Sequence, residues 1–399
     1  MLKIAILTYS TKPRGGVVHS LCLAENLAKR GHEVRIIALD KKEGGGFFRT
    51  PQVPHEIIRF GALPEHFDDK IEAYIQTYTD YFVGGKAEGF DIYHAQDCIS
   101  ANALVNYRLS GADFPLVRTV HHLDDFTSPV LMDCQNKSVL RPDAHIAVSK
   151  FWQKRLAAEY GVKAGIIHNG LDTKRFSPVK KGEKHKAKFG LENKLVFLTI
   201  GGIEPRKNTK KLLAAFAHVR KYFAESGKQV VLVIGGGQTL FDYQAYRQEF
   251  FQMVEGYNLK MGEDVINLGV LKEEEVPLLY QAADCFAFPS VQEGWGLVAL
   301  EALLSGIPTV VSDIPVFHEF LTPGEDALFV NPDNAEQFAA AMIETIMDTN
   351  LRRRLISGGL MTASNFSWED TARKHEQFYY EILEGAQTNK WAPKRIPRS

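Results

Sequence analysis

The sequence has no long apolar run, little cysteine and almost no net charge. No stretch of the 399 residues approaches the roughly 18 continuous apolar residues of a membrane-spanning helix. The four cysteines, Cys22, Cys98, Cys134 and Cys285, are too far apart for a disulfide scaffold or a CxxC metal pair. A net charge of -1 argues against nucleic acid as a partner. We expect a cytoplasmic protein, with membrane contact peripheral at most.

Two successive halves of the chain show the same alternation of short Val, Ile and Leu runs with helical patterns. This alternation is typical of parallel sheets covered on both faces, so we expect an α/β protein with two doubly wound, Rossmann-like domains. Residues 1–176 form the first and 177–365 the second, separated by a lysine-rich, Pro-containing stretch at 177–190. The expected strands lie within residues 3–10, 33–40, 91–97, 115–122, 144–149, 165–170, 195–202, 229–237, 264–270, 285–290 and 308–313.

Helical patterns lie between and after these strands, the first of them at 19–31. We expect helices at 209–223, 273–284 and 296–306, and a long helical stretch over 334–356. A last helix, 366–385, starts after the N-cap Ser367 and could close either domain. Residues 386–399 form a basic, Pro-containing segment, which we interpret as a solvated tail rather than an anchor.

Ligands of such sheets bind at the carboxyl ends of the strands, so the loops there are the place to seek function. In the first loop, Gly15 and Gly16 precede a helix whose N-terminal N–H groups suit an anion, although a tight turn would also explain them. The dinucleotide pattern GxGxxG is absent, because no third glycine follows Gly16 at the required spacing.

The second loop carries Arg206 and Lys207, just before a helix expected to start near Asn208 or Thr209. Two adjacent cations at a strand end suit a diphosphate. A solvated charge pair is the plainer interpretation, since lysine is common in this segment.

The third loop contains EGWGLVALE, with Glu293 on the loop and Glu301 about one turn inside a helix beginning near Leu297. The N–H groups at this helix start could bind phosphate, while the carboxylates accept hydrogen bonds from hydroxyls. An anion beside a polyol describes a nucleotide-sugar. The N–H groups in question belong to Gly296, Leu297 and Val298.

Read together, these segments resemble the retaining nucleotide-sugar glycosyltransferases of the GT-B fold, family four, whose signature is E-x7-E in EGFGLxxxE. The likeness extends through PRGGVVHSLCLAENLAKRGHEV, VRTVHH, HNGLD, GGIEPRKN, LYQAADCFAFPS, SGIPTVVSD and FSWEDTA. It implies two domains facing across a deep cleft, an acceptor-binding first domain and a donor-binding second domain.

The resemblance also implies roles for single residues. Glu293 would hold hydroxyls of the donor sugar and Glu301 those of the ribose, while Lys207 and Arg206 would hold the diphosphate. Gly16 would let the diphosphate approach the first domain. One departure is Gly202, which replaces the arginine of the commoner GRLxxxK pattern, so we expect Arg206 to supply that charge.

Two further assignments concern the pocket and the reaction centre. Val270 would line the donor pocket, near Trp295. His121 matches the histidine near the reacting sugar, with His122 as the adjacent alternative.

The resemblance implies transfer from a nucleotide-sugar donor to a sugar, lipid-linked or small-molecule acceptor, with retention and without a metal or other cofactor. No DxD sequence accompanies the phosphate loops. Asp124 and Asp125 follow His121 and His122, where acceptor binding or strand-end capping is favoured over a cation site. The alternatives are a phosphorylase-like or epimerase-like enzyme of the same fold, or a non-catalytic nucleotide-sugar-binding scaffold.

Overall fold

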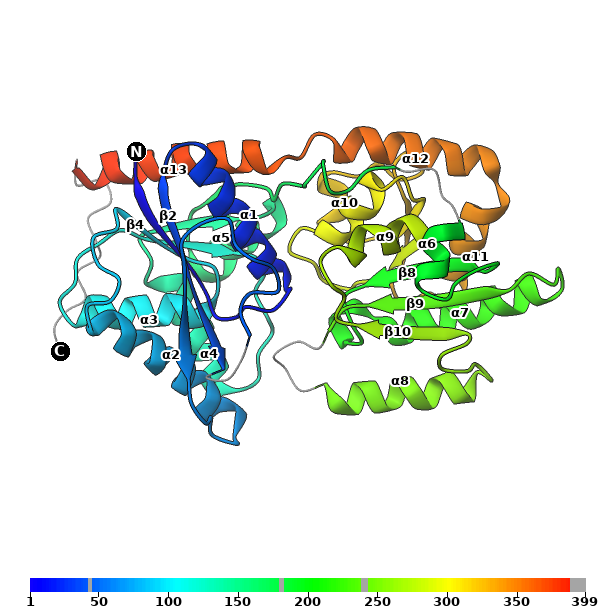
Figure 1. Ribbon diagram of the computed structural model, residues 1–399, viewed down its shortest axis with the longest axis horizontal. Helices are drawn as coiled ribbons and strands as arrows, with labels where there is room; N and C mark the ends of the chain where they lie inside the picture. The colour runs from blue at the N-terminus through cyan, green and yellow to red at the C-terminus, as the bar shows by residue number, and fades with distance from the viewer. Residues whose placement is uncertain (42–44, 179–182, 238–242, 388–399) are drawn as a thin grey trace. The chain divides into compact units, whose positions relative to one another are not determined.

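The computed structural model describes residues 1–41, 45–178, 183–237 and 243–387 (Figure 1). The chain divides into two compact units. Unit 1 comprises Met1–Gly170 and the chain from Trp368 onward, and unit 2 comprises Leu171–Ser367. Most of the predicted basic tail, residues 388–399, lies outside the described residues.

Unit 1 contains a parallel sheet in the order β3-β2-β1-β4-β5-β6-β7. Residues of β1 such as Ile4 and Ile6 are completely buried, as expected for a strand covered on both faces. The order reverses between β1 and β4, and the carboxyl ends of the strands at such a reversal are where sheets of this kind bind ligands. The strands are β1 (Lys3–Thr8), β2 (Glu33–Lys41), β3 (His55–Phe60), β4 (Ile92–Ala95), β5 (Leu116–Val120), β6 (Ala144–Ala147) and β7 (Ala164–Ile166).

The helices of unit 1 begin at side-chain caps where the sequence provides them. Asp97, Ser128 and Ser149 each accept a hydrogen bond from an N–H in the first turn of the helix that follows. The helices are α1 (Gly15–Lys29), α2 (Phe67–Val83), α3 (Cys98–Leu109), α4 (Pro129–Leu140), α5 (Lys150–Tyr160) and α13 (Trp368–Gln387).

The last helix, α13, packs against α1 (Figure 1). Its residues Tyr379 and Ile382 are buried in the same core as Leu21 of α1. Unit 1 is therefore built from two separate segments of the chain, one on each side of unit 2 in the sequence.

Unit 2 contains a second parallel sheet, in the order β10-β9-β8-β11-β12-β13. Its order reverses between β8 and β11. Phe197 of β8 and Phe216 of α7 are among the completely buried residues of its core. The strands are β8 (Leu195–Ile200), β9 (Val230–Gly235), β10 (Val265–Gly269), β11 (Cys285–Phe288), β12 (Thr309–Ser312) and β13 (Leu328–Val330).

The helices of unit 2 cover this sheet and include two short 3-10 segments. They are α6 (Glu183–Lys188), η1 (Pro205–Lys207), α7 (Thr209–Ala224), α8 (Gln244–Gly256), α9 (Glu275–Ala282), α10 (Leu297–Leu304), η2 (Phe317–Glu319), α11 (Ala335–Met347) and α12 (Thr349–Ala363).

The predicted strands are confirmed, since each expected run contains a strand, and α7 and α10 start where the sequence indicated. The single helical stretch over 334–356 is wrong. Asp348 leaves helical geometry there and accepts hydrogen bonds from the N–H groups of Asn350 and Leu351, so its side chain caps a new helix, α12. The strands β3 and β13 were not predicted. Within the described ranges, no helix combines the length and apolar character needed to cross a membrane.

Candidate functional site

In unit 2, the order of the strands brings two predicted loops together. The strands β8 and β11 are neighbours, and Phe197 pairs with Cys285 across them. The loop after β8 carries Arg206 and Lys207, and the loop after β11 carries Glu293. Because both loops leave the carboxyl ends of parallel strands at the reversal of strand order, their side chains meet there.

Glu293 is the centre of this meeting point. Its Oε1 accepts hydrogen bonds from Nζ of Lys207 at 2.7 Å, from a guanidinium nitrogen of Arg206 at 3.1 Å and from Oγ of Ser290 at 2.5 Å. Glu293 and Lys207 are both buried, with 7% and 8% of their surfaces exposed. Glu204, which is also buried, lies 3.6 Å from the Arg206 guanidinium, so two cations and two carboxylates share this confined space.

The charges shift each other's pKa values. Burial alone would raise the pKa of Glu293, but the Lys207 and Arg206 cations and the hydrogen bonds outweigh it and lower the pKa to about 2. Burial lowers the pKa of Lys207 and Arg206 adds to this, while Glu293 opposes them. Lys207 also lies over the ring of Phe288, 4.6 Å from its centre, which further stabilises a cation.

The glycine at 202 has a structural reason. Its φ of +77° is in the left-handed region, and a Cβ there would lie 2.4 Å from the carbonyl oxygen of Gly237. The loops after β8 and β9 therefore pack backbone to backbone, and no arginine fits at 202. Arg206 instead places its guanidinium on Glu293, which supports the expectation that Arg206 supplies the missing charge.

Glu301 lies in the second turn of α10 and contacts Tyr280. The Tyr280 hydroxyl donates to its Oε2 at 2.9 Å. Burial raises the pKa of Glu301 to about 7, although Arg175 and the Tyr280 hydrogen bond act in the opposite direction. Unlike Glu293, this carboxyl group therefore gains and loses its proton near neutral pH.

The predicted phosphate-binding N–H groups lie at the start of α10, where no side chain caps the helix. Gly296 is its N-cap, with φ of +97°, and the N–H groups of Ala299 and Leu300 bond to the Gly296 carbonyl. The N–H groups of Leu297 and Val298 come earlier in the helix and have no acceptor within it, as in the first turn of any helix.

Val270 and Trp295, both predicted to lie near the donor pocket, differ in how far they are exposed. Val270 follows β10 and is 60% exposed, at the carboxyl end of the sheet where a ligand would lie. Trp295, by contrast, is buried, with its ring 4.6 Å from that of Phe320 and 5.4 Å from that of Phe366. Its replacement of the usual phenylalanine is therefore accommodated by aromatic packing inside unit 2.

In unit 1, Gly16 and His121 are adjacent. Gly16 is in the first turn of α1, and a Cβ there would lie 3.6 Å from Cδ2 of His121. His121 directly follows β5, and its ring meets that of His19 edge to face at 4.9 Å. Burial and the nearby Arg118 cation lower the pKa of His121 well below its usual value, so the ring is neutral at pH 7.

His122, Asp124 and Asp125 form contacts that do not involve His121. Nε2 of His122 lies 3.4 Å from Asp124, whereas Asp125 is largely exposed and lies 3.5 Å from Arg155. Among the residues that the structure describes, no group of three or more His, Cys, Asp or Glu side chains could hold a metal ion. The contact with Gly16 makes His121 the better candidate of the two histidines.

Sequence reasoning missed Ser290, Tyr280 and Gln96. Ser290 and Gln96 each follow a buried strand by two or fewer residues, Ser290 after β11 and Gln96 after β4, and that position was the available signal. Tyr280 gave no signal, because only the fold brings α9 beside α10.

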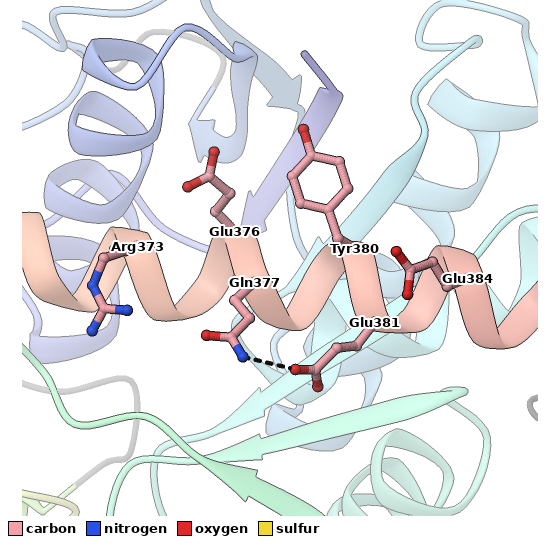
Figure 2. A pocket seen from close by; sticks show the side chains of 6 residues that line it. All are labelled: Arg373, Glu376, Gln377, Tyr380, Glu381 and Glu384. Carbon is pink, nitrogen blue, oxygen red and sulfur yellow. Dashed lines mark hydrogen bonds between the residues drawn. The ribbon is translucent and has the colours of Figure 1, made fainter.

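A surface hollow lies along α13, as Figure 2 shows. It is lined by Arg373, Glu376, Gln377, Tyr380, Glu381 and Glu384. Glu376 is engaged by Arg30 and His32, and Arg373 pairs with Asp370, so its charged groups are held within unit 1. Its mainly acidic lining does not suit a phosphate.

Comparison with protein families gives two matches that together cover most of the chain. Residues 13–175 match the model of Glycosyltransferase Family 4, and residues 181–360 match that of Glycosyl transferases group 1. The chain belongs to this family of glycosyltransferases, and its fold is of the GT-B type.

The chain is similar to the O-antigen chain mannosyltransferase RfbU of Salmonella typhimurium, with 31% identity over 238 residues. That match spans 58% of this chain and 60% of the relative, less than two thirds of its length. A sucrose-phosphate synthase structure from Thermosynechococcus elongatus has a TM-score of 0.78 at 22% identity, covering 96% of this chain and 100% of that one. HepE of Anabaena, solved with UDP-glucose, has a TM-score of 0.75 at 22% identity, with coverage of 96% and 100%.

Proposed function

We propose that this protein transfers a glycosyl group from a nucleotide-sugar donor to an acceptor hydroxyl, with retention of anomeric configuration and without a metal ion. The observation that carries the proposal is the arrangement of Lys207 and Arg206 on Glu293 at the carboxyl ends of β8 and β11. Two similar proteins support it: RfbU is a mannosyltransferase, and HepE was solved with UDP-glucose.

The site provides its charges before the donor arrives. Lys207 and Arg206 lie together beside Glu293, so two cationic groups are in place to hold a diphosphate. As the bond from the sugar to the diphosphate breaks, negative charge grows on the leaving phosphate. Lys207 and Arg206, already fixed by Glu293, stabilise that charge with little reorganisation, which is how preorganised groups lower a barrier.

Glu293 holds donor-sugar hydroxyls and does not act as a nucleophile. Its Oε1 accepts three hydrogen bonds and its pKa is about 2, so its negative charge is strongly stabilised and poorly reactive toward carbon. Retention then requires that the acceptor hydroxyl attack from the face that the phosphate leaves, with the departing phosphate taking the acceptor's proton.

The remaining residues of unit 2 bind other parts of the donor. Glu301 accepts hydrogen bonds from the ribose, and the N–H groups of Gly296, Leu297 and Val298 bind phosphate oxygens. Val270 lines the donor pocket. In unit 1, Gly16 allows the close approach of the diphosphate, and the neutral His121 forms a hydrogen bond with the reacting sugars.

The decisive experiment is calorimetric binding of UDP, GDP, ADP and TDP and their common sugar conjugates, in the presence of EDTA. We expect one nucleotide to bind the wild type, and Lys207→Met to weaken it at least about tenfold, the factor of one lost charge-assisted hydrogen bond. Lys211→Met is the matched control, because Lys211 is exposed and donates to a backbone oxygen of Asp333.

Product analysis then separates the alternatives. With the identified donor and a panel of sugar, lipid-linked and small-molecule acceptors, the coupling of the product's anomeric proton reports retention or inversion. Turnover with orthophosphate, or formation of an epimer, would instead indicate the phosphorylase-like or epimerase-like reaction. Absence of any nucleotide binding at millimolar concentration would contradict the proposal.

A further inference from the structure

Gln96 lies at the carboxyl end of β4, between two histidines, and is buried. Its Oε1 is 3.1 Å from Nε2 of His121, and its Nε2 is 3.2 Å from Nε2 of His94. One amide group therefore connects the predicted reaction centre to the interior of unit 1.

The connection continues to the last helix. His94 is completely buried, and its Nδ1 lies 2.7 Å from the hydroxyl of Tyr379 on α13. Its Nε2 also lies 2.7 Å from Oγ1 of Thr119, on the neighbouring strand β5. A continuous chain of hydrogen bonds thus runs from His121 through Gln96 and His94 to Tyr379.

The chemistry of the amide assigns a direction to this chain. A side-chain amide oxygen only accepts and its nitrogen only donates. Nε2 of His121 must therefore carry a hydrogen, and Nε2 of His94 must lack one. His94 is then protonated on Nδ1, from which it donates to the Tyr379 hydroxyl.

Both histidines are neutral at pH 7. Burial, reinforced by the Arg118 cation, lowers the pKa of His121 and of His94 well below the usual value. A neutral imidazole with its hydrogen on Nε2 keeps an acceptor lone pair on Nδ1. In His121 the Cδ2 and Nε2 edge faces Gly16, so Nδ1 is on the other edge of the ring.

We propose that Gln96 is a positioning residue that holds His121 in its Nε2-protonated tautomer, so that Nδ1 accepts a hydrogen bond from a hydroxyl of the reacting sugars. This inference rests on the proposed function, because it specifies how His121 acts in it. Gln96 itself touches no substrate and acts only through His121.

The tautomer can be measured without substrate. In full-length protein labelled with ¹⁵N-histidine, two-bond ¹H–¹⁵N spectra distinguish protonated from unprotonated ring nitrogens, and the His121 signals are those lost in His121→Asn. We expect an Nε2-protonated His121 in the wild type and in Gln96→Glu, which keeps an acceptor. Gln96→Leu should convert it to a mixture of tautomers. Asn26→Leu is the control: it removes a buried amide that donates to the backbone of Cys22, and should leave the spectrum unchanged.

Kinetics test whether Gln96 acts through His121. Gln96→Leu should lower kcat by about tenfold, the factor of one lost hydrogen bond, with the KM for the donor nearly unchanged. In a His121→Ala background the same substitution should have no further effect, because the group that it positions is gone.

The results separate this inference from the proposed function. An Nδ1-protonated His121 in the wild type, an unchanged tautomer in Gln96→Leu, or an equal loss of kcat in the His121→Ala background would each overturn the role of Gln96 in an active transferase. A protein that binds no nucleotide but shows the expected tautomers would contradict the proposed function and leave the positioning of His121 supported.

Discussion

Lys207 donates a hydrogen bond to Glu293 across 2.7 Å, although the two residues are 86 positions apart in the chain. Neither lies in a strand; each occupies the loop after one of two neighbouring strands. The sheet thus brings together, as a buried ion pair, two residues that are far apart in the sequence. The pair combines a stability effect with a binding role, and the two can be measured separately.

Removing the carboxylate should destabilise unit 2. Glu293→Gln removes the carboxylate that Lys207 is hydrogen-bonded to and leaves this buried cation beside Arg206, so we expect the free energy of unfolding to fall by about 3–5 kcal/mol at pH 7. The folded pKa of about 2 is below the ordinary 4.5, so the ionised carboxylate contributes its stability above pH 4.5 and loses it as the pH falls toward 2. Urea denaturation from pH 7 to pH 3 should show the gap between wild type and variant closing.

A surface pair provides the control for that measurement. Glu249 pairs with Lys210, and its side chain is 58% exposed. Glu249→Gln should change stability by no more than about 0.5 kcal/mol. If Glu293→Gln were equally mild, the buried pair would have no structural importance.

Donor affinity should depend on pH through Glu301. With a pKa of about 7, Glu301 is mostly protonated at pH 6 and ionised at pH 8, and only the carboxylate accepts two ribose hydrogen bonds. We expect the nucleotide-sugar to bind about tenfold more tightly at pH 8 than at pH 6. Calorimetry with the sugar conjugate is preferable, because its phosphates do not titrate in this range.

The same group has the opposite effect on stability. Because the folded pKa of Glu301 is raised above 4.5, its contribution to stability is complete below pH 4.5 and is lost as the pH rises through 7. Glu301→Gln should remove both dependences. Tyr280→Phe removes a donor to the carboxylate and should shift the binding midpoint to higher pH. An unchanged pH profile in Glu301→Gln would assign the dependence to another group.

Gly16 should be required for binding and dispensable for folding. A methyl group at 16 meets His121 at 3.6 Å, an ordinary contact, so Gly16→Ala should leave the melting temperature nearly unchanged. It should lower kcat/KM for the donor at least about tenfold, because the methyl occupies space meant for the diphosphate. Gly15→Ala, with nothing within 4 Å of its added Cβ, should alter neither quantity.

Gly296, in contrast to Gly16, should be required for folding. Its φ of +97° disfavours any side chain, and a Cβ would lie 2.6 Å from Cε1 of the buried Phe317. Gly296→Ala should therefore cost about 1–3 kcal/mol in the free energy of unfolding. Gly256→Ala, at the end of α8 with open space around it, should be neutral or slightly stabilising in the same denaturation experiment.

The sequence predicts most of the fold because periodicity and strand-end glycines are local signals. The runs at 195–202 and 285–290 specify β8 and β11, and Leu297 marks the start of α10. The sequence did not predict that Lys207 and Arg206 contact Glu293, because only the strand order shows that the loops after β8 and β11 meet. The break at Asp348 was hidden by helical periodicity on both sides of it. The packing of Trp295 likewise depends on Phe366, 71 residues away in number but adjacent in space.

The return of α13 to unit 1 affects the order in which the protein can fold during synthesis. Residues 1–170 leave the ribosome first, but their core lacks Tyr379 and Ile382 until the chain has been made beyond α13. At about 5–20 residues per second, that delay is on the order of ten seconds or more. The continuous segment 171–367 has no such requirement. The unit that is translated second is therefore the first that can complete its core.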